Sequence, residues 1–209
     1  MFINKASTIV FQGDSITAGN IISCNENSLG DGYVFFIDTY IKSIYPEYDV
    51  NIVNKGVDGD SILNLKKRWK ETCVNLHPDI ITLLIGINDI WDKYYSDNYL
   101  TDEEFLFHYD DIICDSMLNG VKKIVLMEPF IIPVNSDMES WRKDIYSKID
   151  IVRRLAKKYN CTYIPLDSIF GELCTIKGPE YWSNDGIHPN VKGHFIIARS
   201  WLQMMNAWI

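Results

Sequence analysis

A serine near the start of the chain has the surroundings of a nucleophile. Ser15 directly follows Gly13-Asp14, which in turn follows the apolar run 8–11. A serine hydroxyl attacks a carbonyl carbon only when a neighbouring base removes its proton, and a glycine before it permits a sharp turn and the close approach of a substrate. Alternatively, Ser15 caps a helix, because serine is a favoured N-cap residue. This segment alone leaves both interpretations open.

Among the four histidines, His188 is the best candidate for that base. It lies in an irregular segment just before a predicted helix, with Asp185 three residues upstream. One turn brings residues at this spacing into contact, so Asp185 can accept from one imidazole nitrogen and leave the other for Ser15. A surface turn capped by an aspartate explains the same segment. The other histidines lie within or at the ends of predicted helices: His77, His108 and His194.

Two further residues can stabilise a negative charge that develops on a carbonyl oxygen. Gly56 offers a backbone N–H that no side chain of its own shields, and Asn88 offers a side-chain amide. Together with the N–H of Ser15, they have the donor chemistry of an oxyanion hole. Turn formation explains the glycine equally well, and a helix cap explains Asn88.

Short apolar runs rich in β-branched residues predict the strands of a parallel sheet, since strands covered on both faces are apolar almost throughout. They span residues 8–11, 50–53, 80–85, 123–127 and 162–164. Helical segments are predicted between and after them, over residues 33–44, 61–76, 102–118, 139–159 and 191–205. This alternation predicts an α/β fold of three layers, with about five parallel strands and helices on both faces, in one domain over residues 1–209.

The candidate residues fall where these strands end. Ser15 follows the first predicted strand, Gly56 the second and Asn88 the third. In open α/β sheets, ligands bind outside the carboxyl ends of the strands. Each residue has a structural explanation of its own, but their coincidence at one edge of one sheet favours a nucleophilic site with an oxyanion hole.

The composition argues against several classes of partner. The 209 residues are 47% hydrophobic and 23% charged, with a formal net charge of -8. Nucleic acids and anionic membranes attract basic proteins, so we expect neither as a partner. The cysteines are scattered without C-x-x-C spacing, which predicts reduced thiols and no zinc site: Cys24, Cys73, Cys114, Cys161 and Cys174. We expect no metal or other cofactor, and a cytoplasmic location because the N-terminal apolar run is too short for a signal peptide.

Four segments resemble the sequence blocks of SGNH, or GDSL-type, hydrolases, in the family's order along the chain. They are Gly13–Thr17, the stretch with Asn54, Gly56 and Gly59, Gly86–Asp89, and Asp185–Pro189. The resemblance implies a flavodoxin-like α/β/α fold and a metal-free serine esterase. It also implies that Ser15 is the nucleophile, that Asp185 and His188 complete its triad, and that Gly56 and Asn88 join Ser15 in the oxyanion hole.

Other stretches are similar to intracellular acetylxylan esterases of Gram-positive bacteria, including Gly32–Val34, Leu65–Trp69 and Ile85–Trp91. This similarity implies hydrolysis of small acyl esters, above all O-acetyl esters on carbohydrates such as acetylated xylo-oligosaccharides. Candidates for the substrate pocket are Asp14, Asp89, Trp91, Tyr94, Phe130 and Trp182. Aromatic faces stack well on sugar rings, although packing in the core is the commoner role of such residues.

Three alternatives remain at this stage. A lysophospholipase or thioesterase of the same fold would act on a longer acyl chain. A non-catalytic flavodoxin-like module would bind without using the triad, but the chain has no glycine pattern typical of nucleotide-binding loops. A protein that acts chiefly as a scaffold would bury its apolar C-terminal run, Trp201–Ile209, in another subunit. This run is compatible with a homo-oligomer and equally with packing inside one chain.

Overall fold

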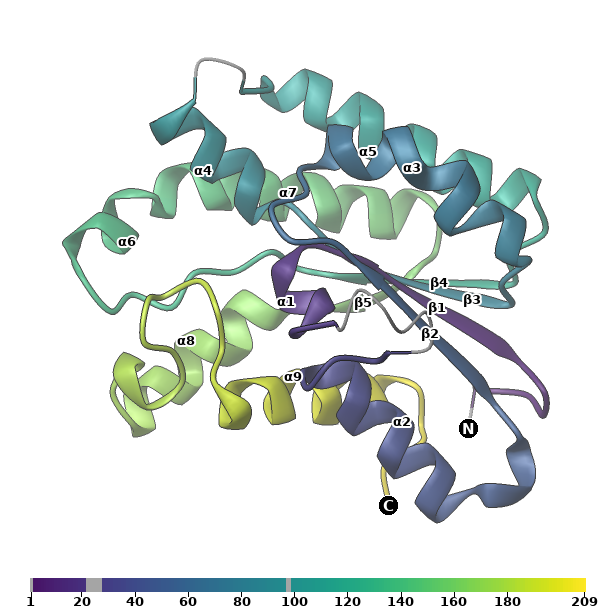
Figure 1. The fold of residues 1–209 in the computed structure, drawn as a ribbon. Helices are drawn as coiled ribbons and strands as arrows, with labels where there is room; N and C mark the ends of the chain where they lie inside the picture. Colours follow the sequence, from purple (N-terminus) through teal and green to yellow (C-terminus); the bar gives the residue numbers. More distant parts are fainter. Residues whose placement is uncertain (1, 22–27, 97–98) are drawn as a thin grey trace.

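The β-branched runs form an all-parallel sheet in the computed structural model, which describes residues 2–21, 28–96 and 99–209 (Figure 1). The strands are β1 (Thr8–Gly13), β2 (Asn51–Gly56), β3 (Ile80–Leu84), β4 (Lys123–Met127) and β5 (Thr162–Ile164). Their order, β2-β1-β3-β4-β5, is that of flavodoxin-like sheets. The predicted α/β fold with a five-stranded parallel sheet is thus confirmed.

Alternate residues of β1 pack on opposite faces of the sheet, as the pleat of a strand requires. Ile9 and Phe11 belong to the core on one face, whereas Val10 belongs to the core on the other. At the end of β1, Gly13 pairs with Gly56 of β2 and with Leu84 of β3. The carboxyl ends of these three strands are therefore level, and the loops that follow them leave the sheet at one edge.

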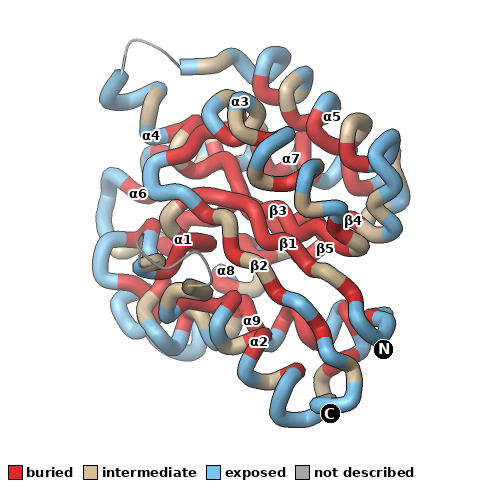
Figure 2. Tube along the Cα trace, turned by 45° about the vertical axis from the view of Figure 1, so that its right-hand side comes forward, coloured by how far each residue is buried: buried red, intermediate tan, exposed pale blue. Residues whose placement is uncertain are grey.

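Helices cover both faces of the sheet. Figure 1 shows α3 (Ile62–Thr72), α5 (Asp102–Leu118) and α7 (Arg142–Lys158) above it, with α2 (Tyr33–Ile44), α8 (Leu166–Ile176) and α9 (Val191–Met204) below. Their apolar sides are buried against the strands, while their outer sides face solvent (Figure 2). The buried Trp201 of α9 donates its indole N–H to Thr82 Oγ1 of β3 at 2.9 Å, which satisfies a polar group inside the core.

Shorter helices lie at the carboxyl edge, where the sequence predicted mostly loops. They are α1 (Ser15–Ala18), α4 (Ile87–Tyr95) and α6 (Ser136–Ser140), and single 3₁₀ turns lie elsewhere at Pro46–Tyr48, Val74–Leu76 and Pro179–Tyr181. The predicted helix 139–159 is broken at Trp141, where α6 ends and α7 begins. Helices α4 and α8 were not predicted, and α8 follows Pro165 without a side-chain cap.

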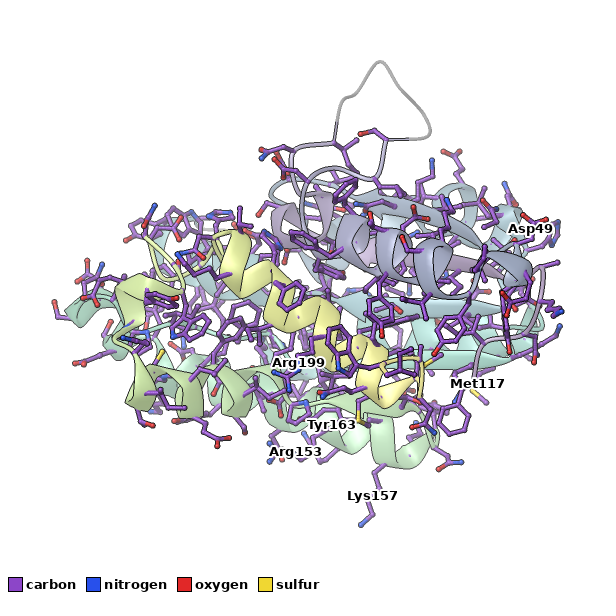
Figure 3. The ribbon with its side chains drawn as sticks, turned by 90° about the horizontal axis from the view of Figure 1, so that it is seen from below. Asp49, Met117, Arg153, Lys157, Tyr163 and Arg199 are labelled. Carbon is purple, nitrogen blue, oxygen red and sulfur yellow. The ribbon has the colours of Figure 1, made fainter. Side chains whose placement is uncertain are left out.

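Buried polar groups fix the loop that follows β4. Glu128 is fully buried and accepts from Arg153 Nη2 at 3.0 Å and from the Tyr163 hydroxyl. Figure 3 shows Arg153 and Tyr163 close together on one side of the molecule. Burial raises the pKa of Glu128, and the hydrogen bond and charge of Arg153 counteract this effect. These hydrogen bonds hold the start of the 128–134 loop, which leads to the candidate site.

The described cysteines are free thiols: Cys73, Cys114, Cys161 and Cys174. Cys24 lies outside the described residues. No helix in the described part of the chain combines the length and the apolar character needed to cross a membrane.

Candidate active site

Ser15 is the first residue of α1, and its hydroxyl does not cap that helix. The preceding Asp14 is the N-cap, and its Oδ1 accepts from the Ile16 N–H at 3.0 Å. The interpretation of Ser15 as an N-cap is therefore wrong. Ser15 Oγ instead lies 2.8 Å from His188 Nε2. Gly13 permits this sharp turn, since a Cβ there would lie 2.3 Å from the Leu84 carbonyl oxygen.

His188 and Asp185 lie together on the turn before α9. His188 Nδ1 is 2.7 Å from Asp185 Oδ2, while Asp185 Oδ1 accepts the backbone N–H groups of Ile187 and His188 at 2.9 and 2.8 Å. Partial burial raises the pKa of Asp185, but the hydrogen bonds from His188 and Ile187 outweigh it and hold the pKa below its ordinary value. A charged carboxylate here keeps the imidazole proton on Nδ1 and leaves Nε2 to accept from Ser15.

Ser183, which the sequence did not single out, organises the same turn from beneath. It is fully buried, and its Oγ lies 2.7 Å from the His188 carbonyl oxygen and 3.1 Å from Asp185 Oδ1. The same oxygen accepts the Gly186 N–H at 2.9 Å. Gly186 has a φ of 87°, and a Cβ there would lie 2.5 Å from the Ile132 carbonyl oxygen. A buried serine near an aspartate has no sequence signature that distinguishes it from other loop serines.

The prediction that the Gly56 N–H is an oxyanion donor is wrong, because this N–H already has an acceptor. Gly56 is buried at the end of β2, and its N–H donates to Asn54 Oδ1 at 3.0 Å. The Asn54 side chain also donates to the carbonyl oxygens of Thr17 at 2.7 Å and of Leu29 at 2.9 Å. Asn54 therefore joins β2 to α1. It also accepts the Gly56 N–H that the sequence analysis expected to bind the substrate oxygen.

Gly59, three residues further along the chain, offers a different backbone N–H. It lies in an exposed turn after β2, with a φ of 76° and open space where a Cβ would stand. Its N–H has no hydrogen-bond acceptor among the described residues. Asn88, in the first turn of α4, donates to the carbonyl oxygen of Asp60 at 3.0 Å, which places its amide beside this turn and leaves it a second N–H. Ser15 adds a backbone N–H at the start of α1, where helical N–H groups lack intrahelical partners.

The two acidic candidates for the substrate pocket lie beneath the site, so that prediction is wrong for both. Asp14 and Asp89 are 1% and 3% exposed. Asp14 caps α1, and Asp89 accepts the Ile62 N–H at the start of α3 at 3.1 Å. Burial raises the pKa of each carboxyl group to about 7. They connect the helices of the site and do not line a pocket.

Two of the aromatic candidates belong to the core. Phe130 is fully buried and stacks on Phe170 with ring centroids 4.6 Å apart. Trp182 is 8% exposed and donates its indole N–H to the Lys177 carbonyl oxygen at 3.3 Å. The prediction that these rings line the substrate pocket is wrong, because neither offers an open face.

The other two aromatic candidates form an exposed cluster on α4. Trp91 is 43% exposed, and its ring lies 4.7 Å from that of Tyr95 and 5.7 Å from that of the buried Trp141. Tyr94 stacks on Trp141 at 5.0 Å and donates its hydroxyl to Asp144 at 2.8 Å. We call Trp91 and Tyr95 the aromatic platform. Trp141 was not among the predicted site residues.

Residues 11–196 match the model of the GDSL-like lipase/acylhydrolase family. This range includes Ser15, Asp185 and His188. The chain belongs to this family. The resemblance stated from the sequence is confirmed, and membership makes the protein a carboxylic ester hydrolase.

Known proteins similar to this family member match it over nearly its whole length. An acetylxylan esterase from Geobacillus stearothermophilus is 32% identical over 210 residues, which is 97% of this chain and 95% of that protein. The crystal structure of Axe2, an acetylxylan esterase from the same organism, has a TM-score of 0.90 and 29% identity, over 98% of this chain and 96% of that one. LAE5, an alpha/beta hydrolase enzyme from the metagenome of Lake Arreo, Spain, has a TM-score of 0.92 and 26% identity, over 100% and 99%.

Proposed function

We propose that this GDSL-family hydrolase is a serine esterase in which Ser15 is the nucleophile, His188 the general base and Asp185 the carboxylate that orients the base. The observation that carries the proposal is the 2.8 Å approach of Ser15 Oγ to His188 Nε2, with Asp185 at 2.7 Å on the other ring nitrogen. Structures described as catalytic mutants of Axe2 have alanine in place of a serine, an aspartate or a histidine, which supports the same three roles.

In the proposed reaction, His188 Nε2 takes the Ser15 proton as Oγ bonds to the ester carbonyl carbon. The oxygen that becomes negative is stabilised by the N–H groups of Ser15 and Gly59 and by the Asn88 amide. The intermediate collapses as His188 returns the proton to the departing alcohol, leaving an acyl group on Ser15. Water then attacks that ester with the same base, and the acid is released.

The proposed substrate is a small acyl ester of a carbohydrate, above all an O-acetyl ester such as acetylated xylo-oligosaccharides carry. The relatives named acetylxylan esterases support this assignment. So does the aromatic platform, because exposed indole and phenol rings provide flat apolar faces for sugar rings. Trp91 follows Asn88 by three residues on α4, so it lies about 4.5 Å further along the helix on a neighbouring side.

Contacts of α6 support the placement of the platform beside the triad. A Cβ on Gly186 would lie 2.7 Å from Met138 Cγ, so α6 touches the turn that carries Asp185 and His188. Trp141, at the end of the same helix, packs edge-on against Trp91. One short helix therefore joins the base turn to the platform. We therefore propose that a sugar ring stacks on Trp91 while its acetyl group reaches Ser15.

Composition and surface support narrower proposals about partners and location. The net charge of -8 disfavours nucleic acid and anionic membranes as partners, and the free thiols favour a cytoplasmic location. Much of the apolar C-terminal run is buried within its own chain, including Trp201, Leu202, Met205 and Ala207. An apolar groove of about 260 Å³ between α2 and α9 supports a homo-oligomer.

A substrate panel tests the proposed function. The purified protein is assayed with an aryl acetate, an aryl octanoate and acetylated xylo-oligosaccharides, with Ser15→Ala as the matched blank. We expect both acetyl substrates to be hydrolysed and the octanoate to react roughly ten- to a hundredfold more slowly, since a pocket closed around a methyl group excludes longer chains. Preference for octanoate would favour the lysophospholipase or thioesterase alternative. No turnover of any ester would favour a binding module.

A further inference from the structure

The Arg68 guanidinium on α3 donates hydrogen bonds to four residues behind the candidate active site. Its Nε donates to Asp60 Oδ2 at 2.6 Å, and its Nη1 donates to Gln12 Oε1 at 2.7 Å and Thr72 Oγ1 at 3.1 Å. Its Nη2 donates to the Gly13 carbonyl oxygen at 3.2 Å. The Arg68 side chain is only 16% exposed. Most of the N–H groups of Arg68 therefore donate to the end of β1, the loop after β2 and the end of α3 rather than to solvent.

Two of these partners belong to the loops that hold the reacting groups. Gly13 is the last residue of β1, two positions before Ser15. Asp60 follows Gly59, and its own carbonyl oxygen accepts the Asn88 amide at 3.0 Å. The Gly13 carbonyl also accepts the Val57 N–H at 3.0 Å. We call residues 57–61 the oxyanion loop. Arg68 bonds this loop and the strand end before the nucleophile with one planar group.

Two partners of Arg68 are buried, so water cannot take the place of the guanidinium unless the surrounding residues move. Asp60 is 7% exposed and Gln12 is fully buried. Burial raises the pKa of Asp60, and the hydrogen bond and charge of Arg68 counteract this effect. Without the guanidinium, the Asp60 carboxylate must take up a proton or turn outward to water. Turning outward moves the Asp60 backbone, and with it the Asn88 amide and the Gly59 N–H.

We propose that Arg68 is a positioning residue of this esterase, which holds the oxyanion loop at the correct distance from Ser15. The proposal rests on the function assigned above, because it requires Ser15 as nucleophile and the loop as part of the oxyanion hole. Arg68 acts through Asp60 and Gly13 and is not assigned a contact with substrate. Its loss should therefore lower kcat, which depends on transition-state geometry, and leave KM nearly unchanged.

Substitution with chemical rescue tests this role. For Arg68→Ala we expect kcat with an aryl acetate to fall about 10- to 100-fold, the scale of a misplacement near 1 Å, with little change in KM. Low concentrations of methylguanidinium should restore part of kcat by occupying the vacated space. Arg68→Lys should be intermediate, because one ammonium can pair with Asp60 but cannot also reach Gln12 and Gly13 in the same plane.

Two controls separate positioning from general stability. Ile112→Val removes a methylene from the buried α5 core in the same helical layer, outside the hydrogen bonds of Arg68, and should leave kcat unchanged despite a lower Tm. Arg154→Ala removes an exposed arginine paired with Asp150, and methylguanidinium should not increase its rate. If Arg68→Ala does not fold, Arg68→Lys is judged by its own kcat and KM.

A folded Arg68 variant with unchanged kcat, or with its loss confined to KM, would overturn the proposal. So would a kcat loss in Arg68→Ala that methylguanidinium does not relieve. Ser15→Ala is assayed in parallel. Its inactivity together with an unaffected Arg68 variant would refute the role of Arg68 alone, whereas full activity of Ser15→Ala would refute the proposed function itself.

Discussion

Ser15 Oγ and His188 Nε2 lie 2.8 Å apart although 173 residues separate them in the chain. The sheet brings Ser15 to the carboxyl edge at the end of β1, its second strand in spatial order. His188 reaches the same edge on the turn before α9, and α9 is anchored below the sheet by the hydrogen bond from Trp201 to Thr82. The hydrophobic core therefore fixes this contact before any substrate binds, which is the preorganisation that catalysis by a serine requires.

Replacing Asp185 by Asn should lower kcat by about 10⁴-fold without unfolding the protein. Asparagine keeps an oxygen for the N–H groups of Ile187 and His188, but it places an NH₂ group beside His188 Nδ1 and favours the wrong tautomer. Steady-state kinetics with an aryl acetate measure the effect. Asp150→Asn, which changes an exposed aspartate on α7, is the matched control and should behave like the parent. A rate near the parental value for Asp185→Asn would refute its assigned role.

Replacing Asn88 by Ala should lower kcat by about 10²–10³-fold, the usual cost of one lost oxyanion donor. KM should change little, since the lost hydrogen bond strengthens only as charge develops. Gly56→Ala provides a contrast, because its new Cβ would lie 2.3 Å from the Ala18 nitrogen and should destabilise the fold. Kinetics and thermal unfolding of both variants distinguish the two effects. If Asn88→Ala changed KM alone, Asn88 would bind the ground state of the substrate instead.

Replacing Trp91 by Ala should raise KM for acetylated xylo-oligosaccharides and leave the hydrolysis of an aryl acetate nearly unchanged. An aromatic contact contributes about 0.5–1.5 kcal/mol, which corresponds to roughly a two- to tenfold change in KM. Phe107, which is 63% exposed on α5, offers a matched control, and Phe107→Ala should affect neither substrate. Equal losses on both substrates would indicate that Trp91 supports the site's structure and does not bind sugar.

Replacing Asp89 by Asn should stabilise the protein more at pH 8 than at pH 4. Burial raises the pKa of Asp89 to about 7, so between about 4 and 7 the folded state keeps a proton that the unfolded chain releases. Stability therefore falls as pH rises through this window. Asparagine removes that loss while keeping an acceptor for the Ile62 N–H. Each kcal/mol should appear as roughly 2–4 °C in Tm. An equal Tm difference at both pH values would contradict this explanation.

The fold and the Asp185–His188 contact were predictable because each has a strong local signal. Buried parallel strands are apolar along their length, so the β-branched runs identified all five strands to within a few residues. Asp185 and His188 form an i,i+3 pair on one turn, which spacing alone predicts. Helix α8 also has a readable signal, since Leu166, Ile169, Phe170 and Leu173 recur at helical spacing. That helix was missed because its N-terminus has no capping residue.

The errors in the site come from contacts that spacing does not encode. The predicted second strand ended at residue 53, whereas β2 continues to Gly56 because the polar Asn54 is buried and bonded to α1. The sequence therefore carries no sign that the Gly56 N–H is already bonded to Asn54. Likewise, aromatic residues near the strand ends look alike in sequence, yet Phe130 is buried and Trp91 is exposed. The difference comes from packing: Phe130 lies against Phe170 of α8, whereas Trp91 of α4 contacts Trp141 at the end of α6 and stays partly open to solvent.

The central claim is that Ser15 is the nucleophile activated by His188. The most direct measurement is the reaction of the purified protein with a fluorophosphonate, which modifies activated serine hydroxyls, followed by mapping of the modified peptide by mass spectrometry. The predicted result is one equivalent of label on Ser15, loss of esterase activity in step with labelling, and no labelling of folded Ser15→Ala or His188→Ala. Inactivation with the label on another residue, or full activity of folded Ser15→Ala, would contradict it.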